Sequence, residues 1–349
     1  MTEGYSPIDN SIAKGIDFLE EHQLHNGEII NYFSTSEDLK TDCVNYSITY
    51  ATSFTCHSLT FLSKNDKVKK IISKAADFLY GQLYYGVWNF CANYHHLYNI
   101  VPFDVDSTSL AASAVLDALG GYSGDKVTAK ILLANRDKKG LFYTWIVPRL
   151  ATTYNKRFLR IASHVFLSPV EHTIFWNKTS CNYADNDLGI NANVLSYLGD
   201  IPETQPIITA INTAILENRE ATCDKWYYNP FVIYHLFSRN YYKGITKLEP
   251  IRQPIIDRII SQAEDSGCLG GNLFNTALGA CVLQNFHHQS PVLNKAIQFI
   301  IKAQNTNGSW ERWAHYYAGN MYLYFGSEEI TTAFCLEALS RYRDLSGNN

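Results

Sequence analysis

Apolar residues recur along most of the chain at alternating spacings of three and four positions, the period of an α-helix that buries one face. Segments with this amphipathic pattern are separated by segments built almost entirely from apolar and small residues, with hardly any charge. A helix that is apolar or small on every side is typical of a buried helix. The pattern therefore predicts two sets of helices, one on the surface and one enclosed by it.

The two sets alternate along the sequence. The amphipathic helices are predicted near residues 9–22, 66–82, 124–134, 205–217, 250–263 and 292–303. The buried helices are predicted near residues 47–62, 107–119, 189–198, 230–237, 274–283 and 329–342. No long alternating strand pattern competes with them. Six hairpins, each an outer helix followed by an inner one, predict an all-α fold of one domain over residues 1–349, an (α/α)6 barrel.

Three of the outer helices share a sequence repeat. The copies begin at Lys14, Lys74 and Lys295. Each reads Lys, a small residue, two further residues, Phe and then Leu or Ile, followed by a Gln and a turn that contains Gly. In the second and third copies the turn also holds a tryptophan, Trp88 or Trp310. A pattern repeated at nearly fixed internal spacing indicates a repeated structural unit, here the outer helix and the turn that follows it.

The segment at about 135–187 interrupts the alternation of outer and inner helices, between the third outer and the third inner helix. Residues 140–148 predict a short strand or part of a hairpin. The segment also holds a basic run, with Arg149, Lys156, Arg157 and Arg160. An insertion of this length in a compact fold is usually functional or disordered, and its aromatic residues argue against disorder. We expect a lid over a cavity or part of a cavity wall.

The predicted topology gathers side chains at one rim of the barrel. Since every inner helix enters in the same direction, the inner N-termini meet at a common mouth, which favours anions. Asp104 and Asp106 stand immediately before the second inner helix. One carboxylate is explained as a helix N-cap. The second, in an aromatic setting, would couple to the first, so that one carboxyl stays protonated at neutral pH and acts as an acid toward an alkene. The residues alone leave both interpretations open.

Two motifs carry a resemblance to a known superfamily. The repeat described above resembles the QW repeat of squalene cyclases and prenyltransferases. The segment Asp104-Val105-Asp106-Ser107-Thr108-Ser109 resembles the DxDD motif of class II terpene cyclases, and more closely the DxD-T-T variant of drimane-type cyclases, because Ser107 replaces the last aspartate. The resemblance implies that Asp106 is the general acid, that Asp104 holds and tunes it, and that Thr108 matches the last threonine of the variant.

Aromatic and polar residues elsewhere are candidates for substrate contacts at the same rim. Aromatic faces stabilise a carbocation much as they stabilise an ammonium group, although each ring also has an ordinary explanation in core packing. The aromatic candidates are Tyr94, Phe103, Trp226, Tyr227, Tyr228 and Tyr234. The polar candidates are His96, which would bond a catalytic carboxylate or remain a solvated loop residue, and Asp187 and Asn191, which would form a polar wall, contact a magnesium diphosphate or cap a helix.

Composition and charge exclude several classes of function. The 349 residues include 46% apolar residues and carry a net charge of 29 − 33 = −4, so the chain lacks the basic surface of a nucleic-acid-binding protein. No stretch approaches the roughly 18 consecutive apolar residues of a transmembrane helix, and no signal peptide is visible. The eight cysteines show no CxxC spacing, which predicts reduced thiols, a cytoplasmic protein and no protein-bound metal.

Together with the resemblance, these features predict a class II terpene cyclase that acts on a linear isoprenoid, farnesyl or geranylgeranyl diphosphate. Class II chemistry leaves the diphosphate intact, so Mg²⁺ would assist its binding. The candidate phosphate contacts are Arg149, Lys156, Arg157, Arg160 and Lys225. A separate phosphatase would act on the product. Two alternatives remain, a carbohydrate-active (α/α)6 enzyme with a pair of catalytic carboxylates and a non-catalytic barrel that binds a lipid or a partner protein.

Overall fold

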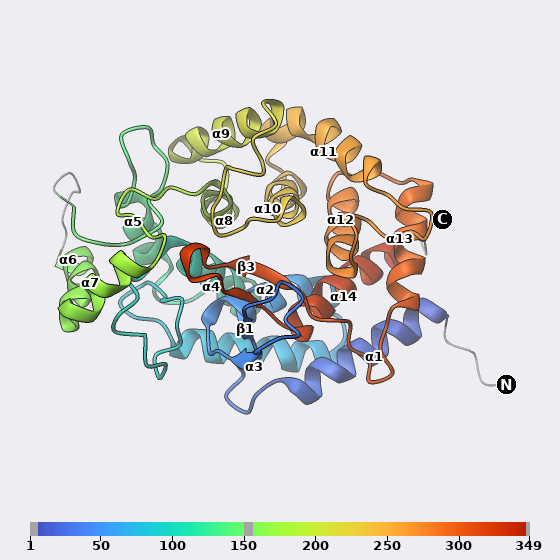
Figure 1. Ribbon diagram of the computed structural model, residues 1–349, viewed down its shortest axis with the longest axis horizontal. Helices are drawn as coiled ribbons and strands as arrows, with labels where there is room; N and C mark the ends of the chain where they lie inside the picture. The colour runs from blue at the N-terminus through green and yellow to red at the C-terminus, as the bar shows by residue number, and fades with distance from the viewer. Residues whose placement is uncertain (1–5, 150–155, 347–349) are drawn as a thin grey trace.

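The computed structural model describes residues 6–149 and 156–346, and its helices include the two predicted sets. The outer helices are α1 (Pro7–His22), α3 (Asp66–Gly81), α5 (Asp125–Ala134), α9 (Gln205–Leu216), α11 (Glu249–Ser261) and α13 (Pro291–Lys302). The inner helices are α2 (Thr49–Leu59), α4 (Val105–Leu119), α8 (Leu188–Leu198), α10 (Pro230–Tyr242), α12 (Leu273–Asn285) and α14 (Glu328–Ser346). Figure 1 shows α9, α11, α13, α1 and α3 following one another around the periphery, with α8, α10 and α12 inside them.

The inner helices form a closed ring. α2 packs on α4, α4 on α8, α8 on α10, α10 on α12 and α12 on α14, and α14 returns to pack on α2. Among the outer helices, α13 of the last hairpin contacts α1 of the first. The prediction of an (α/α)6 barrel is confirmed.

The inner helices run in the same direction, as their two ends show. The starts of α2, α4 and α8 line one cavity, with Tyr50, Asp106 and Ile190 in its wall. The ends of α2, α4 and α10 line a second cavity of about 480 Å³, with His57, Asp117 and Tyr242 in its wall. The inner N-termini therefore gather at one mouth of the barrel and the C-termini at the other.

In its first and last copies, the sequence repeat joins an outer helix to its neighbour. The Nε2 atom of Gln23 donates to the carbonyl of Ile71 in α3 at 2.9 Å, and that of Gln304 donates to the carbonyl of Ser11 in α1 at 2.9 Å. The turn glycine packs just as closely, because a side chain at Gly308 would place its Cβ 2.3 Å from the carbonyl oxygen of Lys14. Through Gln304 and Gly308, the last copy of the repeat closes the ring against the first copy.

Four short strands form a sheet that the sequence pattern does not predict. They are β1 (Tyr32–Ser34), β2 (Val44–Asn45), β3 (Ala314–Tyr317) and β4 (Tyr324–Gly326), in the antiparallel order β2-β1-β4-β3. β1 and β2 connect α1 to α2, and β3 and β4 connect α13 to α14. The sheet therefore ties the first hairpin to the last on the side where the inner helices begin. Strands of two to four residues are too short to show an alternating pattern.

The insertion between α5 and α8 contains further helical structure. It holds α6 (Lys156–Ala162), a 3-10 turn (Ser163–Leu167) and α7 (Pro169–Lys178). Residues 140–148 are predicted as a short strand or part of a hairpin, and the structure has the second form. An antiparallel bridge joins Arg136 to Phe142, and the N–H of Tyr143 donates to the carbonyl of Asn135 at 3.0 Å. A further isolated bridge joins Asp104 to Trp145, and no strand of the sheet forms here. Other 3-10 turns lie at Thr60–Leu62, Pro202–Thr204, Thr246–Leu248 and Gly319–Met321. None of the described helices has the length and apolar character needed to cross a membrane.

Candidate active site

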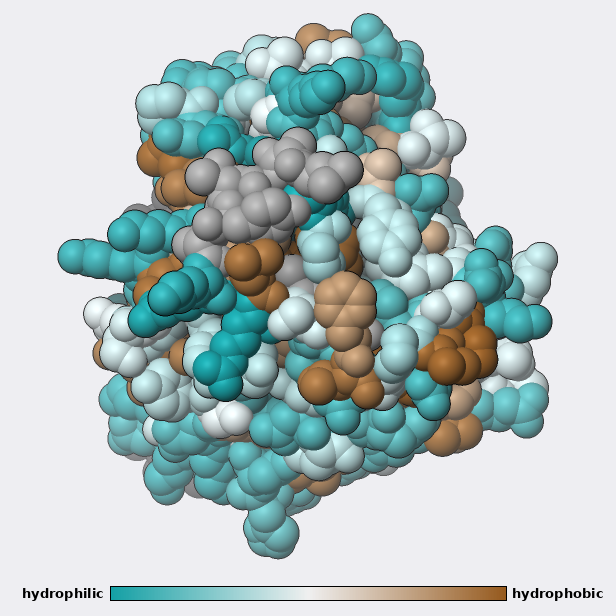
Figure 2. Space-filling model, turned by 90° about the vertical axis from the view of Figure 1, so that its left-hand side faces the viewer, coloured by the Kyte–Doolittle hydropathy of each residue, from teal (hydrophilic) through white to brown (hydrophobic). Residues whose placement is uncertain are grey.

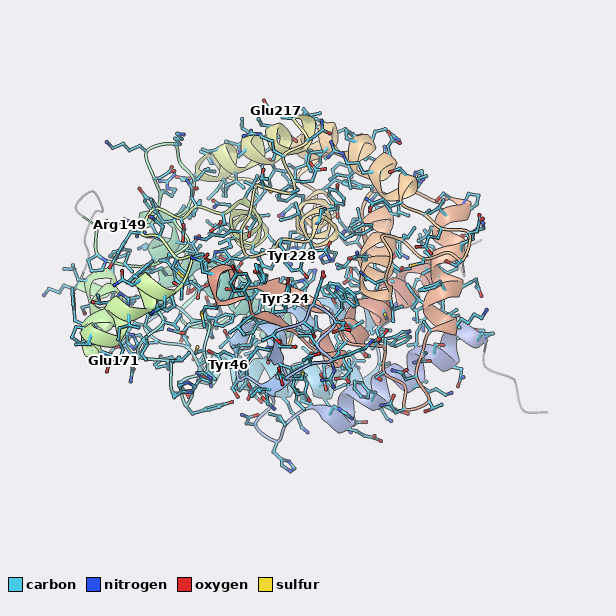
Figure 3. The ribbon with its side chains drawn as sticks, in the orientation of Figure 1. Tyr46, Arg149, Glu171, Glu217, Tyr228 and Tyr324 are labelled. Atoms are coloured by element: carbon cyan, nitrogen blue, oxygen red, sulfur yellow. The ribbon has the colours of Figure 1, made fainter. Side chains whose placement is uncertain are left out.

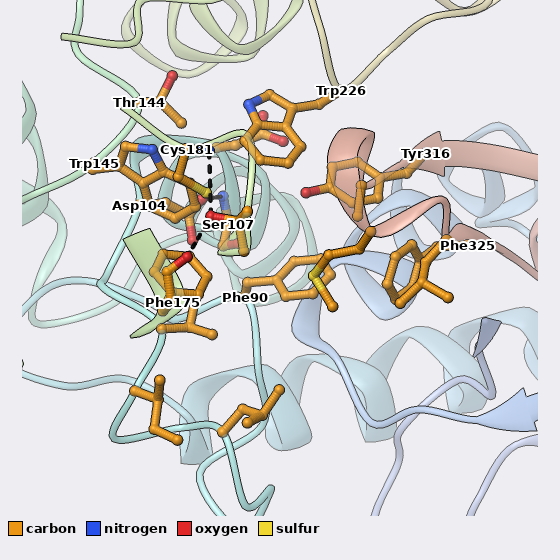
Figure 4. A pocket seen from close by; sticks show the side chains of 18 of the residues that line it. Phe90, Asp104, Ser107, Thr144, Trp145, Phe175, Cys181, Trp226, Tyr316 and Phe325 are labelled. Atoms are coloured by element: carbon orange, nitrogen blue, oxygen red, sulfur yellow. Dashed lines mark hydrogen bonds between the residues drawn. The ribbon is translucent and has the colours of Figure 1, made fainter. Parts of the chain in front are cut away.

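A cavity of about 350 Å³ lies where the inner helices begin. Its wall combines the first turns of α4 and α8 with residues of α7, β3 and β4. Figure 4 shows aromatic rings from several elements around the same space. The aromatic lining residues are Tyr46, Tyr50, Phe90, Trp145, Phe175, Trp226, Tyr316 and Phe325. A concave, largely apolar cavity of this size, with several aromatic rings in its wall, is suited to an apolar small molecule.

Two carboxylates hold the indole rings of this wall in place. Asp187 accepts hydrogen bonds at Oδ2 from the Trp226 indole at 3.1 Å and from the Thr144 hydroxyl at 3.0 Å. Asp185 accepts from the Trp145 indole at 3.1 Å and pairs with Lys225 at 2.5 Å. Burial raises the pKa of Asp187. The predicted polar residue Asp187 therefore lies directly behind the lining and orients the ring of Trp226.

Asp104 caps helix α4 from inside the protein. Its Oδ1 accepts from the backbone N–H of Ser107 at 2.6 Å, so the N-cap interpretation holds for this residue. Its side chain lines the cavity (Figure 4), and its Oδ2 is buried without a hydrogen-bond partner in the described part of the chain. Burial, followed by the charge of Asp106, raises the pKa of Asp104 to about 8. A neutral carboxyl is thus favoured here at neutral pH.

Asp106 occupies the first turn of α4 and lines the same cavity, with 8% of its surface exposed. Its Oδ1 accepts from Nδ2 of Asn193 at 2.5 Å, and its Oδ2 accepts from the hydroxyl of Tyr227 at 2.6 Å. Burial raises its pKa to about 6, while the two hydrogen bonds and the nearby charge of Arg239 oppose the rise. Burial therefore brings the pKa of Asp106 closer to neutral pH. The Asn193 amide and the Tyr227 hydroxyl are in place to bond its carboxylate form.

Asn193 and Arg239, which the sequence analysis missed, complete the hydrogen-bond network behind Asp106. Arg239 on α10 donates from its guanidinium to Oδ1 of Asn193, which turns the amide so that its Nδ2 faces Asp106. Arg239 is 4% exposed and lies inside the barrel. The predicted inner helix ended at residue 237, short of this arginine, whereas α10 continues to Tyr242. A buried amide in an otherwise apolar helix, as at Asn193, is the sequence signal that would have found the network.

Asp224, which the sequence analysis also missed, bonds backbone N–H groups that position the site. Asp224 accepts hydrogen bonds at Oδ2 from the backbone N–H groups of Gly189 and Ile190, at 2.9 and 3.3 Å. Its Oδ1 accepts from the N–H groups of Trp226 and Tyr227, both at 2.8 Å. One buried carboxylate thus caps α8 and fixes the turn that carries both aromatic residues. Burial and the charge of Asp187 raise its pKa.

Of the ten predicted substrate contacts, Trp226 lines this cavity and nine do not. Asp187 and Tyr227 bond residues of the lining, and the other seven have partners elsewhere. Contact of these residues with a substrate stays a prediction. Thr108 bonds the backbone of Trp88, Asn191 the backbone of Phe142, Tyr94 the carboxylate of Glu28, Tyr228 that of Glu37 and Tyr234 that of Glu220. Phe103 stacks on Tyr84, and the exposed ring of His96 packs at a tilt against His95. Figure 3 shows Tyr228 beside Tyr324 of the sheet.

The predicted phosphate contacts are spread over the insertion and its surroundings. Arg149 donates to the backbone of Trp145 at 2.9 Å and lies over the ring of Tyr143. Arg160 lies over the ring of Tyr85, and Lys156 and Arg157 are exposed on α6. Lys178 and Glu171 of α7 line the cavity itself. In residues 6–149 and 156–346, no group of three or more His, Cys, Asp or Glu side chains is placed to hold a metal ion.

A comparison of the sequence with protein-family models and with curated proteins gives no match. Solved structures match the fold. A variant of the type II terpene cyclase MstE from Scytonema, in complex with geranylgeranyl dihydroxybenzoate, has a TM-score of 0.72 at 14% identity, covering 97% of this chain and 98% of that one. For ent-copalyl diphosphate synthase from Streptomyces platensis, the TM-score is 0.53 at 11% identity, covering 86% of this chain and 52% of that one.

Enzymes of carbohydrate metabolism share the barrel as well. A possible member of the GH105 family from Klebsiella pneumoniae has a TM-score of 0.52 at 10% identity, covering 99% of this chain and 95% of that one. These similarities show that the chain has the fold of type II terpene cyclases and of such hydrolases. The choice between the two kinds of enzyme depends on the chemistry of the site.

Proposed function

We propose that this protein is a class II terpene cyclase in which Asp106 protonates an alkene of a linear isoprenoid. The observation that carries the proposal is the placement of Asp104 and Asp106, two buried carboxyls with raised pKa values, in the wall of an aromatic cavity. Protonation of an unactivated alkene requires an acid that is shielded from water and a pocket that tolerates a carbocation. The burial of Asp104 and Asp106 and the aromatic rings of the lining support the proposal on both counts.

The proposed reaction begins with transfer of the Asp106 proton to one carbon of a terminal alkene, whose π electrons form the new C–H bond. The adjacent carbon becomes a tertiary cation, and the next alkene closes a ring onto it. Asn193 and Tyr227 stabilise the carboxylate that remains, because their two hydrogen bonds strengthen as charge develops on it. The faces of Trp226 and Tyr316, which stack at 5.6 Å, are suited to stabilise the cations. Loss of a proton, or capture of water, would end the reaction.

The proposed substrate is a linear C15 or C20 isoprenoid, with farnesyl and geranylgeranyl diphosphate as the first candidates. Lys178, at the edge of the cavity, is the side chain best placed to meet a diphosphate end. Mg²⁺ would then bind through the diphosphate and assist its binding, and a separate phosphatase would act on the product. The ligand of the Scytonema enzyme, geranylgeranyl dihydroxybenzoate, adds an isoprenoid attached to an aromatic acid as a third candidate.

The carbohydrate alternative is less well supported by the same residues. A glycosidase acts with two carboxyls on opposite sides of a sugar, about 5 to 9.5 Å apart, in a cleft that binds hydroxyl groups. Here Asp104 and Asp106 lie on one turn, and Asp187 is engaged with Trp226 and Thr144. The wall they share is built mainly from aromatic and aliphatic side chains.

The test is incubation of the purified protein with each of the three isoprenoids, with and without Mg²⁺, and analysis of the products by mass spectrometry. Asp106→Asn is the matched variant, because it keeps the size of the side chain and removes the acidic proton. We expect a cyclic product from the wild type and only linear material from the variant. Linear material alone from both proteins with all three compounds would contradict the proposal and favour a non-catalytic binding barrel.

A further inference from the structure

The second cavity, of about 480 Å³, lies where the inner helices end. In the described part of the chain, it shares no lining residue with the cavity of the candidate active site. We call it the far cavity. Its charged lining residues are Lys69, Asp117, Arg239, Lys243 and Glu337. Since the candidate active site is lined mainly by apolar side chains, the two ends of the barrel are suited to different ligands.

Two of these charged side chains are enclosed by the protein. Hydrophilic residues are common on the surface, as Figure 2 shows for the side of the molecule that carries α6 and α7. Arg239 and Glu337 instead expose only 4% and 1% of their surface. A buried charge is costly unless it is paired and hydrogen-bonded, so the partners of these two residues decide what the cavity can bind.

Arg239 has hydrogen-bond donors to spare. Its Nη2 donates to Asn193, whereas its Nε is buried without a hydrogen-bond partner in residues 6–149 and 156–346. The dipoles of the helices that end here favour cations, but they supply Arg239 with no further acceptor. A guanidinium binds a carboxylate or a phosphate through parallel hydrogen bonds. The guanidinium of Arg239 is therefore suited to bind an anion in the far cavity.

Two other charges of the wall are matched by partners. Glu337 pairs with Arg341, four positions later on α14, at 2.9 Å, although its Oε2 has no hydrogen-bond partner in the described residues. Lys69 pairs with Asp66 at 2.7 Å at the start of α3. These pairs leave Arg239 as the buried cation that has no carboxylate partner of its own among the lining residues.

Lys243 adds a second cation beside Arg239. The two residues are four positions apart at the end of α10, so their side chains share one face. The ammonium of Lys243 donates to the neutral hydroxyl of Ser196 at 2.9 Å. Burial, followed by the charge of Arg239, lowers the pKa of Lys243 to about 8, while burial raises the pKa of Asp117, the remaining carboxyl. The unmatched charge of the far cavity is therefore positive.

Aromatic rings form another part of the wall. Phe61 and Tyr242 line the far cavity with their ring centroids 5.8 Å apart. The guanidinium of Arg341 lies 4.5 Å from each centroid and holds both rings on one side. The cavity is also many times larger than the roughly 30 Å³ that one water molecule occupies. An anion that carries an apolar group fits this wall better than a bare ion.

We propose that the far cavity binds a small organic anion, with a carboxylate or phosphate group held by Arg239 and Lys243 and an apolar part against Phe61 and Tyr242. This site does not depend on the proposed cyclase function, because it follows from side chains that lie outside the candidate active site.

Arg239 also connects the far cavity to the candidate acid. The same guanidinium holds Asn193, which donates to Asp106, and the charge of Arg239 favours the carboxylate form of Asp106. An anion bound to Arg239 offsets that charge, so a bound anion and an ionised Asp106 oppose each other. Coupling between two sites is reciprocal, so removal of the charge of Asp106 should tighten the binding of the anion.

The test is isothermal titration calorimetry of the full-length protein, without any isoprenoid. The probes are phenyl phosphate, benzoate and the neutral benzyl alcohol. The variant is Lys243→Gln, and the matched control is Lys247→Gln, a lysine outside the far cavity that bonds Asp200 at 3.0 Å. Lys178→Gln tests whether the anion binds in the candidate active site instead, because Lys178 lines that cavity. Thermal unfolding checks that each protein is folded.

We expect the wild type, Lys247→Gln and Lys178→Gln to bind one or both anions equally well, and Lys243→Gln to bind at least about tenfold more weakly. Asp106→Asn should bind at least about twofold more tightly at pH 8. No binding of either anion, or equal binding of benzyl alcohol, would overturn the proposal. So would binding that Lys178→Gln weakens and Lys243→Gln does not. Unchanged affinity in Asp106→Asn would overturn the connection to the acid. Because no isoprenoid is present, failure here is distinguishable from failure of the cyclase proposal.

Discussion

Asn193 donates a hydrogen bond of 2.5 Å from its amide to Oδ1 of Asp106, although the two residues lie 87 positions apart in the chain. They meet because α8 packs directly on α4 in the inner ring. Arg239, from the next inner helix, holds the carbonyl oxygen of the same amide. The orientation of the donor to the candidate acid is therefore set by three consecutive helices of the barrel.

Replacement of Asn193 by alanine should slow cyclisation and shift its pH dependence. The amide stabilises the carboxylate form of Asp106 and lowers its pKa, so its loss should raise that pKa and reduce the rate by roughly a hundredfold. Since the reaction needs protonated Asp106, the pH above which activity declines should move upward. Initial rates measured across the pH range test this. A variant with the wild-type rate and the wild-type alkaline limb would show that Asn193 does not act on the acid.

Asn191→Ala provides the matched control for this prediction. Asn191 lies two positions earlier on α8 and bonds the backbone N–H and carbonyl of Phe142, at 2.8 and 3.0 Å. Its loss leaves two buried backbone groups without that partner, so the free energy of unfolding should fall by about 1–3 kcal/mol. The alkaline limb of the pH profile should stay where it is. A shift in both variants would indicate a general loosening of the site.

The two aspartates should differ in their importance for catalysis. Asp106→Asn should reduce the rate at least about a thousandfold, because it removes the proton that is transferred. Asp104→Asn should reduce it less, because asparagine also accepts the hydrogen bond from the Ser107 backbone that caps α4. Product formation by both variants under identical conditions decides the order. The opposite order would assign the acid to Asp104, whose Oδ2 is buried and whose pKa is raised further.

The same pair should make the protein less stable as the pH rises. The folded-state pKa values are raised to about 8 for Asp104 and about 6 for Asp106, against about 3.9 in an unfolded chain. Between about pH 4 and pH 8 the folded state binds more protons than the unfolded state, so the free energy of unfolding falls as pH rises through this window.

Asp104→Asn should remove the larger part of this dependence. Relative to the wild type, its melting temperature should be higher at about pH 8 and little changed at about pH 4, because the wild-type carboxyl is already neutral in the folded state at the lower pH. Thermal unfolding followed by circular dichroism at both pH values tests this. A variant that loses stability equally at both pH values would mean that Asp104 is ionised in the folded protein.

The helices could be predicted from the sequence because their pattern is local. The amphipathic segment near residues 66–82 and the apolar segment near 274–283 each reveal their burial through neighbouring residues, and the structure has α3 and α12 there. The sheet could not be predicted, since Phe33 of β1 pairs with Phe325 of β4. That pairing depends on closure of the whole ring and leaves no periodic signal in a strand of three residues.

The candidate site also has residues that a local pattern reveals and residues that only the folded barrel brings together. Asp104 and Asp106 are found from sequence because they are neighbours on one turn. Asn193 and Arg239 reach Asp106 from other helices, and only the rotation of α8 and α10 in the barrel determines that they face it. Thr108 is named because it matches the motif, and its hydroxyl bonds the backbone of Trp88, a direction that the sequence does not show.

Closure of the barrel can be tested at a single glycine. Gly308 has a φ of +90°, and an added Cβ would lie 2.3 Å from the carbonyl oxygen of Lys14 on α1. Gly244 has a similar φ of +95° with no atom within 4 Å of the same position. Alanine at Gly244 should therefore cost only the left-handed backbone conformation, about 1–2 kcal/mol. Alanine at Gly308 should cost roughly a further 1–3 kcal/mol, because the clash separates α13 from α1. Chemical denaturation of both variants measures the difference, and equal losses would show that the repeat does not hold the first and last hairpins together.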